Sequence, residues 1–385
     1  MMSCPHRPPC PGCPRFGEAG IYPPAREALE ALARSHGGRF HGGRMHYERE
    51  VPISADQTSG FRLRARLAIR GRLGSPKIGL FELGTHRVVH IPHCLVHHPL
   101  INRVASIVRR ALVDARVTSY SEAAHLGTAR YLQVLVERRS QTAQVVVVAN
   151  SSDPQSLATC FDLIRERLGR DLHSLWFNSN CERSNVILGA EFHRVSGPPS
   201  IVEHFGGAAV HYPPGAFGQS NLQVAQSIIE HLRQAIPAGA RVAEFYAGVG
   251  AIGLSLLGRT ADLRMNELNA HSLQGLGLGL AELDAADRAK ISVVPGPAGA
   301  AHAAAAHADV VIADPPRKGL DPELTSYLCE HPPGRFFYVS CAPESLVNDT
   351  RRLTQSGRLR LRGVTVFNMM PFTEHVETIA DFEGV

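Results

Sequence analysis

The sequence is poor in lysine, in charge and in long apolar runs. Its lysines are Lys77, Lys290 and Lys318, so the formal net charge of +5 is carried almost entirely by arginine. No apolar run approaches the ~18 residues that a membrane-spanning helix needs, and the opening MMSCPHRPPCPGCP lacks the apolar core of a secretory signal. We therefore expect a cytoplasmic protein without a membrane segment. The eight cysteines are unevenly spaced in a chain of 385 residues, which argues against a disulfide framework.

The composition is that of an ordinary globular protein with more than one domain. Hydrophobic residues make up 44% and charged residues 19% of the chain, and its length allows two domains that each bury a core. Proline and glycine cluster at 206–218 and predict a boundary there. We expect a cysteine-rich segment at 1–20, an α+β domain at 21–205 and a second domain at 206–385. The mildly basic balance permits a nucleic-acid partner, although a GC-rich genome would give the same arginine bias.

Three cysteines crowd the proline-rich N-terminus. Cys4, Cys10 and Cys13 have the spacing C-x5-C-x2-C in a segment too irregular to form a core, and such a segment is often ordered by a metal. His6 would complete a local zinc site, whereas Cys94, in HIPHCLVHHP, would complete a four-cysteine iron-sulfur site. The spacing leaves both metals open, along with a cysteine-bearing tail that binds neither.

Strand and helix patterns alternate through the first half of the chain. FRLRARLAIRGR, at 61–72, alternates with period two and predicts a strand with one apolar face and one arginine face. The arginine face is either a solvated surface or a stripe that contacts the phosphates of a nucleic acid. Segments 131–137 and 144–150 predict a hairpin, while 99–112 and 157–168 have helical periodicity. This half therefore predicts an α+β domain with antiparallel strands and no active-site motif of its own.

A strand, a glycine turn and a helix follow one another in RVAEFYAGVGAIGLSLL. Gly248, Gly250 and Gly253 spell G-x-G-x-x-G, a loop that lets the backbone approach a nucleotide and that opens a helix. Glu267 ends the next strand candidate at the spacing expected for a carboxylate that binds a ribose. NAD and S-adenosylmethionine both use such an acid, and Tyr246 together with the later motif DPPR favours the methyl donor. The strands that follow predict a doubly wound sheet with an antiparallel end.

Further candidates lie at or near predicted strand ends, where open α/β sheets bind ligands. Cys341 follows the apolar strand FFYVS, and Asp314 with Arg317 follows the apolar strand DVVIA. Single residues of these kinds are often structural, the cysteine as a buried side chain and the aspartate as a turn cap. Glu377 lies in a segment with β propensity where a charged residue is unexpected, and Glu374 is the competing acid.

Several segments, taken in order, resemble a known family. GQSN with Phe217, EFYAGVG, ADPPRKGLD, YVSCAPESL and PFTEHVET resemble the signature of the RNA uracil-5-methyltransferases of the TrmA and RumA type. NSNCERSNVILG also resembles a family segment, so the resemblance covers nearly the whole chain. It implies an α/β fold: a C-terminal class I, Rossmann-like, S-adenosylmethionine-dependent methyltransferase domain, and an N-terminal and central α+β RNA-binding domain that carries an iron-sulfur segment. The implied reaction is methyl transfer to carbon 5 of a uridine through a covalent cysteine-uracil adduct.

The resemblance gives each candidate residue a role. Cys341 is the implied nucleophile, and Glu377 is the implied base that removes the proton from carbon 5. Asp314 and Gln219 would grip the uracil or the cofactor. The implied cofactor-binding residues are Gln219, Tyr246, Gly248, Gly250, Glu267 and Asp314, the substrate-binding residues are Phe217, which would stack on the base, and Arg317, and the iron-sulfur ligands are Cys4, Cys10, Cys13 and Cys94.

The resemblance also indicates a subgroup within the family. A cysteine cluster, with no barrel domain fitting before Cys4, is most similar to the short ribosomal-RNA enzymes, whereas transfer-RNA members generally lack the cluster. We therefore expect 23S ribosomal RNA as the substrate, a 4Fe-4S cluster with zinc as the alternative metal, and a monomer; transfer RNA is the alternative substrate. Ala251 stands where many members have asparagine, Ala247 stands where cysteine is common, and PGPAGAAH lacks the polar residue expected near the adenine.

Proteins of three other classes would need a different set of residues. A metal-stapled RNA-binding protein with a degenerate methyltransferase fold would bind S-adenosylmethionine without turnover, but it would not need Cys341, Asp314 and Glu377 together. An NAD-linked oxidoreductase built on G-x-G-x-x-G leaves these three residues unexplained. An amino methyltransferase for adenine or guanine needs a proline-rich acidic motif that closes on an aromatic residue, and Arg317 stands in that place.

Overall fold

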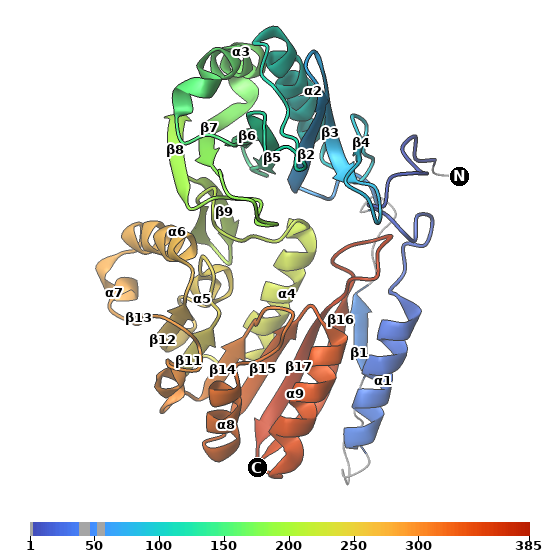
Figure 1. Ribbon diagram of the computed structural model, residues 1–385. Coiled ribbons are helices and arrows are strands. Elements are labelled where there is room, and N and C mark those ends of the chain that lie inside the picture. Colours follow the sequence, from blue (N-terminus) through green and yellow to red (C-terminus); the bar gives the residue numbers. More distant parts are fainter. Residues whose placement is uncertain (1–2, 38–46, 52–57) are drawn as a thin grey trace.

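The computed structural model describes residues 3–37, 47–51 and 58–385 of the chain (Figure 1). Residues 1–2 of the expected cysteine-rich segment, and 38–46 and 52–57 of the expected α+β domain, lie outside the described residues. A sheet of eight strands, a sheet of seven strands and a two-stranded sheet organise the described chain. Within these residues, no helix is both long enough and apolar enough to cross a membrane.

The larger sheet has eight strands in the order β1-β16-β17-β15-β14-β11-β12-β13. The strands from β11 to β15 run parallel, β17 is antiparallel to both of its neighbours, and β1 pairs in parallel with β16. This confirms the predicted doubly wound sheet with an antiparallel end. The strands are β1 (Tyr47–Val51), β11 (Ala240–Phe245), β12 (Thr260–Glu267), β13 (Ile291–Pro295), β14 (Val310–Ala313), β15 (Arg335–Ser340), β16 (Leu359–Phe367) and β17 (Glu377–Gly384).

Helices cover both faces of this sheet, which explains why its central strands are almost continuous apolar runs (Figure 1). Phe337 and Val339 of β15 share a core with one group of helices, whereas Phe336 and Tyr338 share a core with the other group. Alternate residues of one strand are therefore buried against opposite layers. The first group is α4 (Leu222–Ala235), α5 (Ala251–Ser255) and α6 (Ala270–Ala281), which is followed by the short α7 (Ala285–Arg288), and the second is α1 (Pro23–Gly37), α8 (Pro322–Glu330) and α9 (Pro343–Gln355).

The first helix and the first strand belong to the larger sheet and not to the α+β half. Leu29 and Leu32 of α1 are buried in the core that includes α9, and β1 extends the sheet beyond β16 (Figure 1). The expected 21–205 unit therefore differs from the structure at its start, because α1 buries its apolar side against α9 and β16. The boundary expected at 206 stays a prediction.

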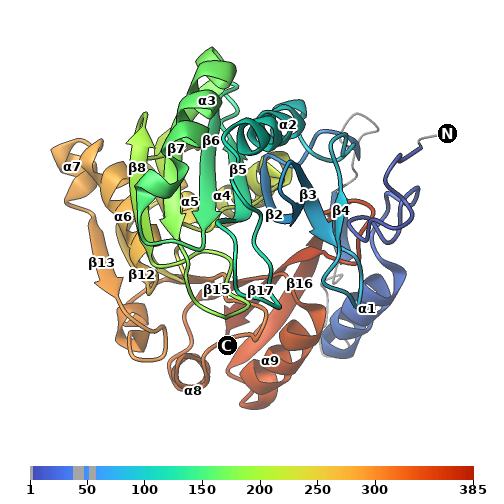
Figure 2. The same ribbon diagram turned by 45° about the horizontal axis from the view of Figure 1, so that its top comes forward.

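The second sheet has seven strands in the order β4-β3-β2-β5-β6-β7-β8, all antiparallel except the β6–β7 pair. Helices α2 (Pro99–Asp114) and α3 (Ala158–Leu168) lie side by side on one face of it (Figure 2). The predicted hairpin forms between β5 and β6, and both predicted helices are present. The strands are β2 (Arg64–Arg72), β3 (Ser75–Phe81), β4 (Val88–His90), β5 (Ala129–Val136), β6 (Ala143–Ala149), β7 (Leu172–Ser179) and β8 (Glu191–Ser196).

The arginine face predicted for 61–72 is partly internal. The apolar face is buried as expected, but Arg64 and Arg70 on the other face are only 7% and 8% exposed. Arg64 donates to the carbonyl of Ala216 at 2.9 Å, and Arg70 forms an ion pair with Glu122. For these two arginines, the prediction of a solvated surface and the prediction of a phosphate-contacting stripe are therefore both wrong. The loops that carry Ala216 and Glu122 hydrogen-bond to them on this side of β2.

A two-stranded sheet, β9 (Ile201–Phe205) and β10 (Ala208–Tyr212), connects the two halves. It contacts α5 and α6, and the chain that follows it returns along the seven-stranded sheet. Gln133 donates to the carbonyl of Pro214 at 2.7 Å, and the N–H of Leu63 donates to the carbonyl of Ser220 at 2.8 Å. These bonds hold the 213–221 segment, which carries two of the predicted site residues, against β2 and β5.

Candidate active site

Five neighbouring strands of the larger sheet bring the predicted catalytic and cofactor residues to one edge. Strand β17 runs in the opposite direction to β15, so its first residue lies where the parallel strands finish. Ser340 pairs with Thr378, and the next position along brings Cys341 beside Glu377. In the strand order β17-β15-β14-β11-β12, the residues at this edge are Glu377, Cys341, Asp314, the loop 246–250 and Glu267.

Cys341 lies half-buried in the turn between β15 and α9. Burial raises the pKa of its thiol, and the carboxyl groups of Glu377 and Asp314 raise it further, whereas the Arg317 guanidinium lowers it. A cysteine reacts as the thiolate, and these surroundings favour the protonated thiol over the thiolate. Added positive charge nearby would favour the thiolate.

Glu377 and Asp314 flank Cys341 on the two neighbouring strands. Glu377 is 7% exposed, and its Oε2 has no hydrogen-bond partner among the residues that the structure describes. Burial, and then the charge of Asp314, raise the pKa of Glu377 to about 8, and Arg317 opposes this. Burial raises the pKa of Asp314 to about 7. Carboxyl groups with raised pKa values at a ligand-binding edge are candidates for proton transfer, whereas the competing Glu374 is exposed.

The loop 314–321 is tied to the helix that follows Cys341. Asp349 of α9 is 4% exposed, and its Oδ2 accepts hydrogen bonds from the backbone N–H of Leu320 and from the hydroxyl of Tyr338, both at 2.9 Å. The same helix therefore begins next to the candidate nucleophile and fixes the loop that carries two other site residues.

The glycine loop has the backbone that its sequence predicts. Gly248 and Gly250 have positive φ angles of 59° and 84°, and α5 starts directly after Gly250. Glu267 accepts backbone hydrogen bonds from Gly248, Leu268 and Asn269 at 2.7, 2.8 and 2.6 Å. Its two carboxylate oxygens offer about four acceptor positions, so one remains for a ribose hydroxyl. This loop and carboxylate fit the nucleoside end of S-adenosylmethionine.

Two further residues support the glycine loop. Tyr246 has a positive φ of 59°, and its hydroxyl accepts from the N–H of Asp321 at 3.0 Å. Glu244 is 3% exposed, and its Oε2 would lie 2.2 Å from a Cβ placed on Gly253, so this position requires glycine. Burial and the charge of Asp314 raise the pKa of Glu244 well above its usual range.

The predicted substrate residues lie nearer the solvent. The Phe217 side chain is 64% exposed, and Gln219 is half-buried. Arg317 is exposed, and its Nη2 lies 3.1 Å from Nδ1 of His375, a hydrogen-bond partner that the sequence did not single out. A residue that stacks on a flipped base must be free before the RNA arrives, and Phe217 meets that condition.

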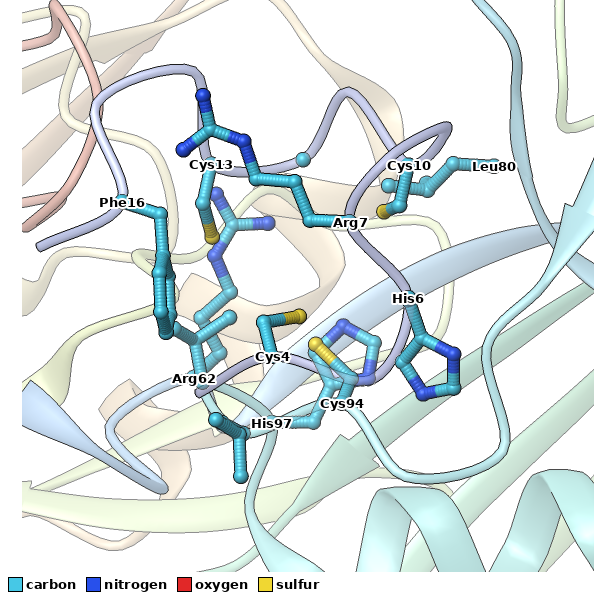
Figure 3. A pocket seen from close by; sticks show the side chains of 13 residues that line it. Cys4, His6, Arg7, Cys10, Cys13, Phe16, Arg62, Leu80, Cys94 and His97 are labelled. Atoms are coloured by element: carbon cyan, nitrogen blue, oxygen red, sulfur yellow. The ribbon is translucent and has the colours of Figure 1, made fainter. Parts of the chain in front are cut away.

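The four N-terminal metal candidates lie together. Cys4, Cys10, Cys13 and Cys94 line one pocket with Arg62 and His6 (Figure 3). Burial, with a contribution from the neighbouring cysteines, raises the pKa of the Cys13 thiol to about 11, and Arg62 opposes this. Within the described residues, no group of three or more His, Cys, Asp or Glu side chains is arranged to hold a metal ion. The Nε2 of His6 accepts from the N–H of His93 at 3.2 Å, which occupies one of its two possible ligand atoms.

The cysteine-rich segment also contacts the chain that leads to Glu377. The rings of Phe16 and Phe372 have centroids 5.3 Å apart, and the N–H of Arg15 donates to the carbonyl of Phe372 at 3.0 Å. The side chain of Asn368 donates to the carbonyl of Ala19. Residues 15–19 therefore support the segment around Phe372 that leads to the candidate base.

Sequence reasoning missed Asp349, Tyr338 and His375. Asp349 left a signal, because it lies three residues after Leu346 and four before Leu353, on the buried side of an amphipathic helix. Tyr338 left none, since an aromatic residue in a buried strand is ordinary.

Comparisons with known proteins show what this chain is similar to. Residues 304–381 match the family model tRNA (Uracil-5-)-methyltransferase. The chain is 32% identical to an uncharacterized RNA methyltransferase of Protochlamydia amoebophila over 99% of this chain and 97% of that protein, and 26% identical to one of Halalkalibacterium halodurans over 97% and 83%. A solved structure, the Pyrococcus abyssi tRNA (uracil-54, C5)-methyltransferase in complex with S-adenosyl-L-homocysteine, has a TM-score of 0.72 and 21% identity, and the match covers 93% of this chain and 83% of that chain. The last comparison shows a common fold.

The Rossmann-like sheet, the glycine loop and the acid at the end of the second parallel strand define a fold that binds a nucleoside-containing cofactor, the class to which S-adenosylmethionine-dependent methyltransferases belong. The full-length relative and the matched family model narrow this class. The chain belongs to the RNA uracil-5-methyltransferase family, and it is an S-adenosylmethionine-dependent RNA methyltransferase of the uracil-5 type.

Proposed function

We propose that this enzyme methylates carbon 5 of a uridine in ribosomal RNA through a covalent bond between Cys341 and carbon 6 of the base. One observation carries the proposal: Cys341 and Glu377 occupy adjacent strand ends, one position beyond the Ser340–Thr378 pair, with Asp314 on the next strand. A thiol and a buried carboxyl group are thus neighbours at the edge where folds of this class bind their cofactor.

The chemistry needs both groups, because carbon 5 of uracil is too weak a nucleophile to take a methyl group unaided. The Cys341 thiolate adds to carbon 6, and the electron pair of the C5–C6 double bond moves into an enolate. Bound S-adenosylmethionine would supply the methyl group to carbon 5 and would leave as S-adenosylhomocysteine, whose sulfur keeps the electron pair of the broken S–CH3 bond. Glu377 then takes the proton from carbon 5, the C5–C6 double bond forms again, and the bond to Cys341 breaks with its electron pair returning to sulfur.

The surroundings of Glu377 suit a base that takes one proton in each catalytic cycle and is then stable in its protonated form. Its Oε2 has no partner among the described residues, so it is available to accept a proton. Burial favours the neutral form that results. Asp314 on the next strand end is assigned to the cofactor or the uracil, and Arg317 to the substrate.

The remaining cofactor residues would bind S-adenosylmethionine and orient it. In this proposal Glu267 binds the ribose, Gly248 and Gly250 allow close approach of the backbone, and Tyr246 and Gln219 contact the donor. The support is that Glu267 already fixes the loop through three backbone hydrogen bonds.

The exposed side chain of Phe217 indicates where RNA would enter the site. A uridine in structured RNA must be flipped out of its stack before its carbon 5 is accessible. Phe217 would stack on the flipped base, and the half of the chain that carries β2 to β8 would hold the surrounding RNA. Ribosomal RNA is our proposal because of the cysteine cluster; the transfer-RNA activity in the name of the Pyrococcus abyssi neighbour supports the alternative.

We infer that the four pocket cysteines would hold an iron-sulfur cluster once it is bound, although no three side chains of the described residues are arranged for a metal ion without it. Four thiolates are the usual ligand set of such clusters, and the Arg62 guanidinium beside them would offset part of their negative charge. The role would be structural, since this segment supports the turn at Phe372. Iron analysis and visible absorption of anaerobically purified protein, compared between Cys94→Ser and the exposed Cys181→Ser, test this inference. Zinc without iron in the wild type would overturn it.

Covalent trapping tests the central proposal. RNA containing 5-fluorouridine should form a denaturation-resistant adduct with the wild type in the presence of the methyl donor, because fluorine cannot leave carbon 5 as a proton does. Cys341→Ala should give no adduct, and Cys181→Ala, which changes an exposed cysteine, should give as much as the wild type. Equal adduct from Cys341→Ala would refute the assigned nucleophile. Parallel reactions with ribosomal and transfer RNA identify the substrate, and gel filtration tests the expected monomer.

A further inference from the structure

The site holds more buried carboxyl groups than the proposed chemistry uses. Glu377 and Glu244 are 7% and 3% exposed, and an oxygen of each has no hydrogen-bond partner among the described residues. Asp314 directly follows β14, which lies between β15, the strand before Cys341, and β11, the strand that carries Glu244, and its charge acts on both glutamates. Three acids therefore crowd one sheet edge, although one base suffices for the reaction.

The charges that face this group are few. Arg317 is the cation that acts on Glu377, and its guanidinium also contacts the exposed His375. Glu244 faces Asp314, the backbone of Gly253 and the more distant Glu267. Opposing positive charge is thus limited to one exposed arginine among the groups that shift these carboxyls, and the free site favours protonated acids.

The two forms of the cofactor differ in charge at this place. Carbon 5 is bonded directly to the carbon that Cys341 attacks, so the donor's sulfonium must approach the same strand ends. S-adenosylmethionine carries that positive sulfur, whereas the product S-adenosylhomocysteine carries a neutral one. The amino, carboxyl and adenosine groups are the same in both forms, so only the charge on sulfur and the methyl group distinguish them.

We propose that Glu377 and Asp314 form a proton-linked selector that favours the charged methyl donor over its neutral product. This rests on the proposed function. Arrival of the sulfonium expels a proton from the pair to solvent, which frees Glu377 to act as the base. After transfer the sulfur is neutral, the proton removed from carbon 5 refills the pair, and the electrostatic hold on the product is lost.

The proton count balances over one cycle. One proton leaves the pair when the donor binds, and one returns from carbon 5 when Glu377 acts. The net reaction releases a single proton, at the binding step and not at the chemical step.

Calorimetry of the RNA-free enzyme tests the selector directly. The binding enthalpy of each cofactor form is measured between pH 6 and 9 in buffers of different ionisation enthalpy. The donor should release on the order of one proton near neutral pH, and the product close to none. Donor affinity should rise up to about tenfold per pH unit from pH 6 to 8 and then level off, while product affinity stays nearly constant. A donor analogue with a protonated amine in place of the sulfonium should behave as the donor does.

Matched variants separate the selector from the cofactor site. Glu377→Gln should retain product affinity, release less than half the wild-type number of protons, and reduce the preference for the donor at pH 8.5 by about tenfold, the scale expected for one charge pair at intermediate dielectric. Glu374→Gln removes an exposed carboxyl from the same turn and should match the wild type. Thermal unfolding confirms that each variant is folded.

The outcomes separate the two proposals. Equal proton release for donor and product, or an unchanged donor preference in Glu377→Gln, overturns the selector while leaving the methyltransferase proposal intact. Failure of the folded wild type to form the 5-fluorouridine adduct overturns the covalent mechanism itself.

Discussion

Asp349 offers the sharpest test of how the site is held together. Its Oδ2 accepts hydrogen bonds from the N–H of Leu320 and the hydroxyl of Tyr338, both at 2.9 Å, and the residue is 4% exposed. Asp349→Ala leaves two buried donors without an acceptor, at about 1–3 kcal/mol each, so we expect a loss of about 2–6 kcal/mol of unfolding free energy. Tyr338→Phe removes one of these bonds and its donor together, and should cost about 1 kcal/mol.

Urea unfolding gives these free energies. The rate at which the 5-fluorouridine adduct forms shows whether the loop 314–321 still places its site residues correctly. The adduct rate should fall in Asp349→Ala with cofactor affinity less affected, because the loop 314–321 carries Arg317 and Asp314. Asp162→Ala removes an exposed ion pair with Arg165 and should change stability by less than about 0.5 kcal/mol. If the unfolding free energy of Asp349→Ala lies within about 0.5 kcal/mol of the wild-type value, roughly the effect of a surface change, then the hydrogen bonds between α9 and this loop do not stabilise the protein as proposed.

Three further changes test other parts of the site. Phe217→Ala should leave stability within about 0.5 kcal/mol, since its side chain is 64% exposed, but raise the KM for RNA at least tenfold; an unchanged KM excludes stacking by this ring. Gly253→Ala should destabilise by about 1–3 kcal/mol and weaken donor binding, because the added Cβ would lie 2.2 Å from Glu244 Oε2, and calorimetry that finds neither effect contradicts this packing. With RNA that contains no 5-fluorouridine, kcat/KM for methylation should rise about tenfold per pH unit below about pH 8 and then level off. The reason is that Glu377, with a pKa of about 8 in the free enzyme, must lose its proton to act as the base. A flat pH profile argues against this role.

The fold of the second half could be predicted because its signals are local. Several strands, such as β14 and β15, are apolar runs near a glycine or a proline, and the order of strands and helices fits a doubly wound sheet. The grouping of Cys341, Asp314 and Glu267 also followed, since parallel strands end at one edge. Glu377 is different: its place beside Cys341 depends on the reversal of β17, for which the sequence offered only an expected antiparallel pair.

Other features depend on contacts between distant segments and left no local pattern. The alternation of 61–72 predicts an arginine face correctly, but not that a loop 150 positions later would bury Arg64 through Ala216. The same limit applies to α1, whose amphipathic pattern does not say which sheet it covers. Spacing indicated a metal at the N-terminal cysteines and a ribose-binding acid at Glu267, but the choice of metal and the catalytic roles of Cys341 and Glu377 came from family resemblance.

The pairing of β1 with β16 has a consequence for how the protein is made. Strand β16 is nine residues long and would be the open edge of its sheet, a surface on which a second chain could add a strand. Among the described strands, the one that closes this edge comes first in the chain, and its partner is the last but one. During synthesis β1 therefore has no partner until β16 has left the ribosome, and it stays unpaired while the strands between them are made. An expression fragment that starts after residue 58 would retain Cys341, Asp314 and Glu377 but expose the edge of β16, and it should aggregate.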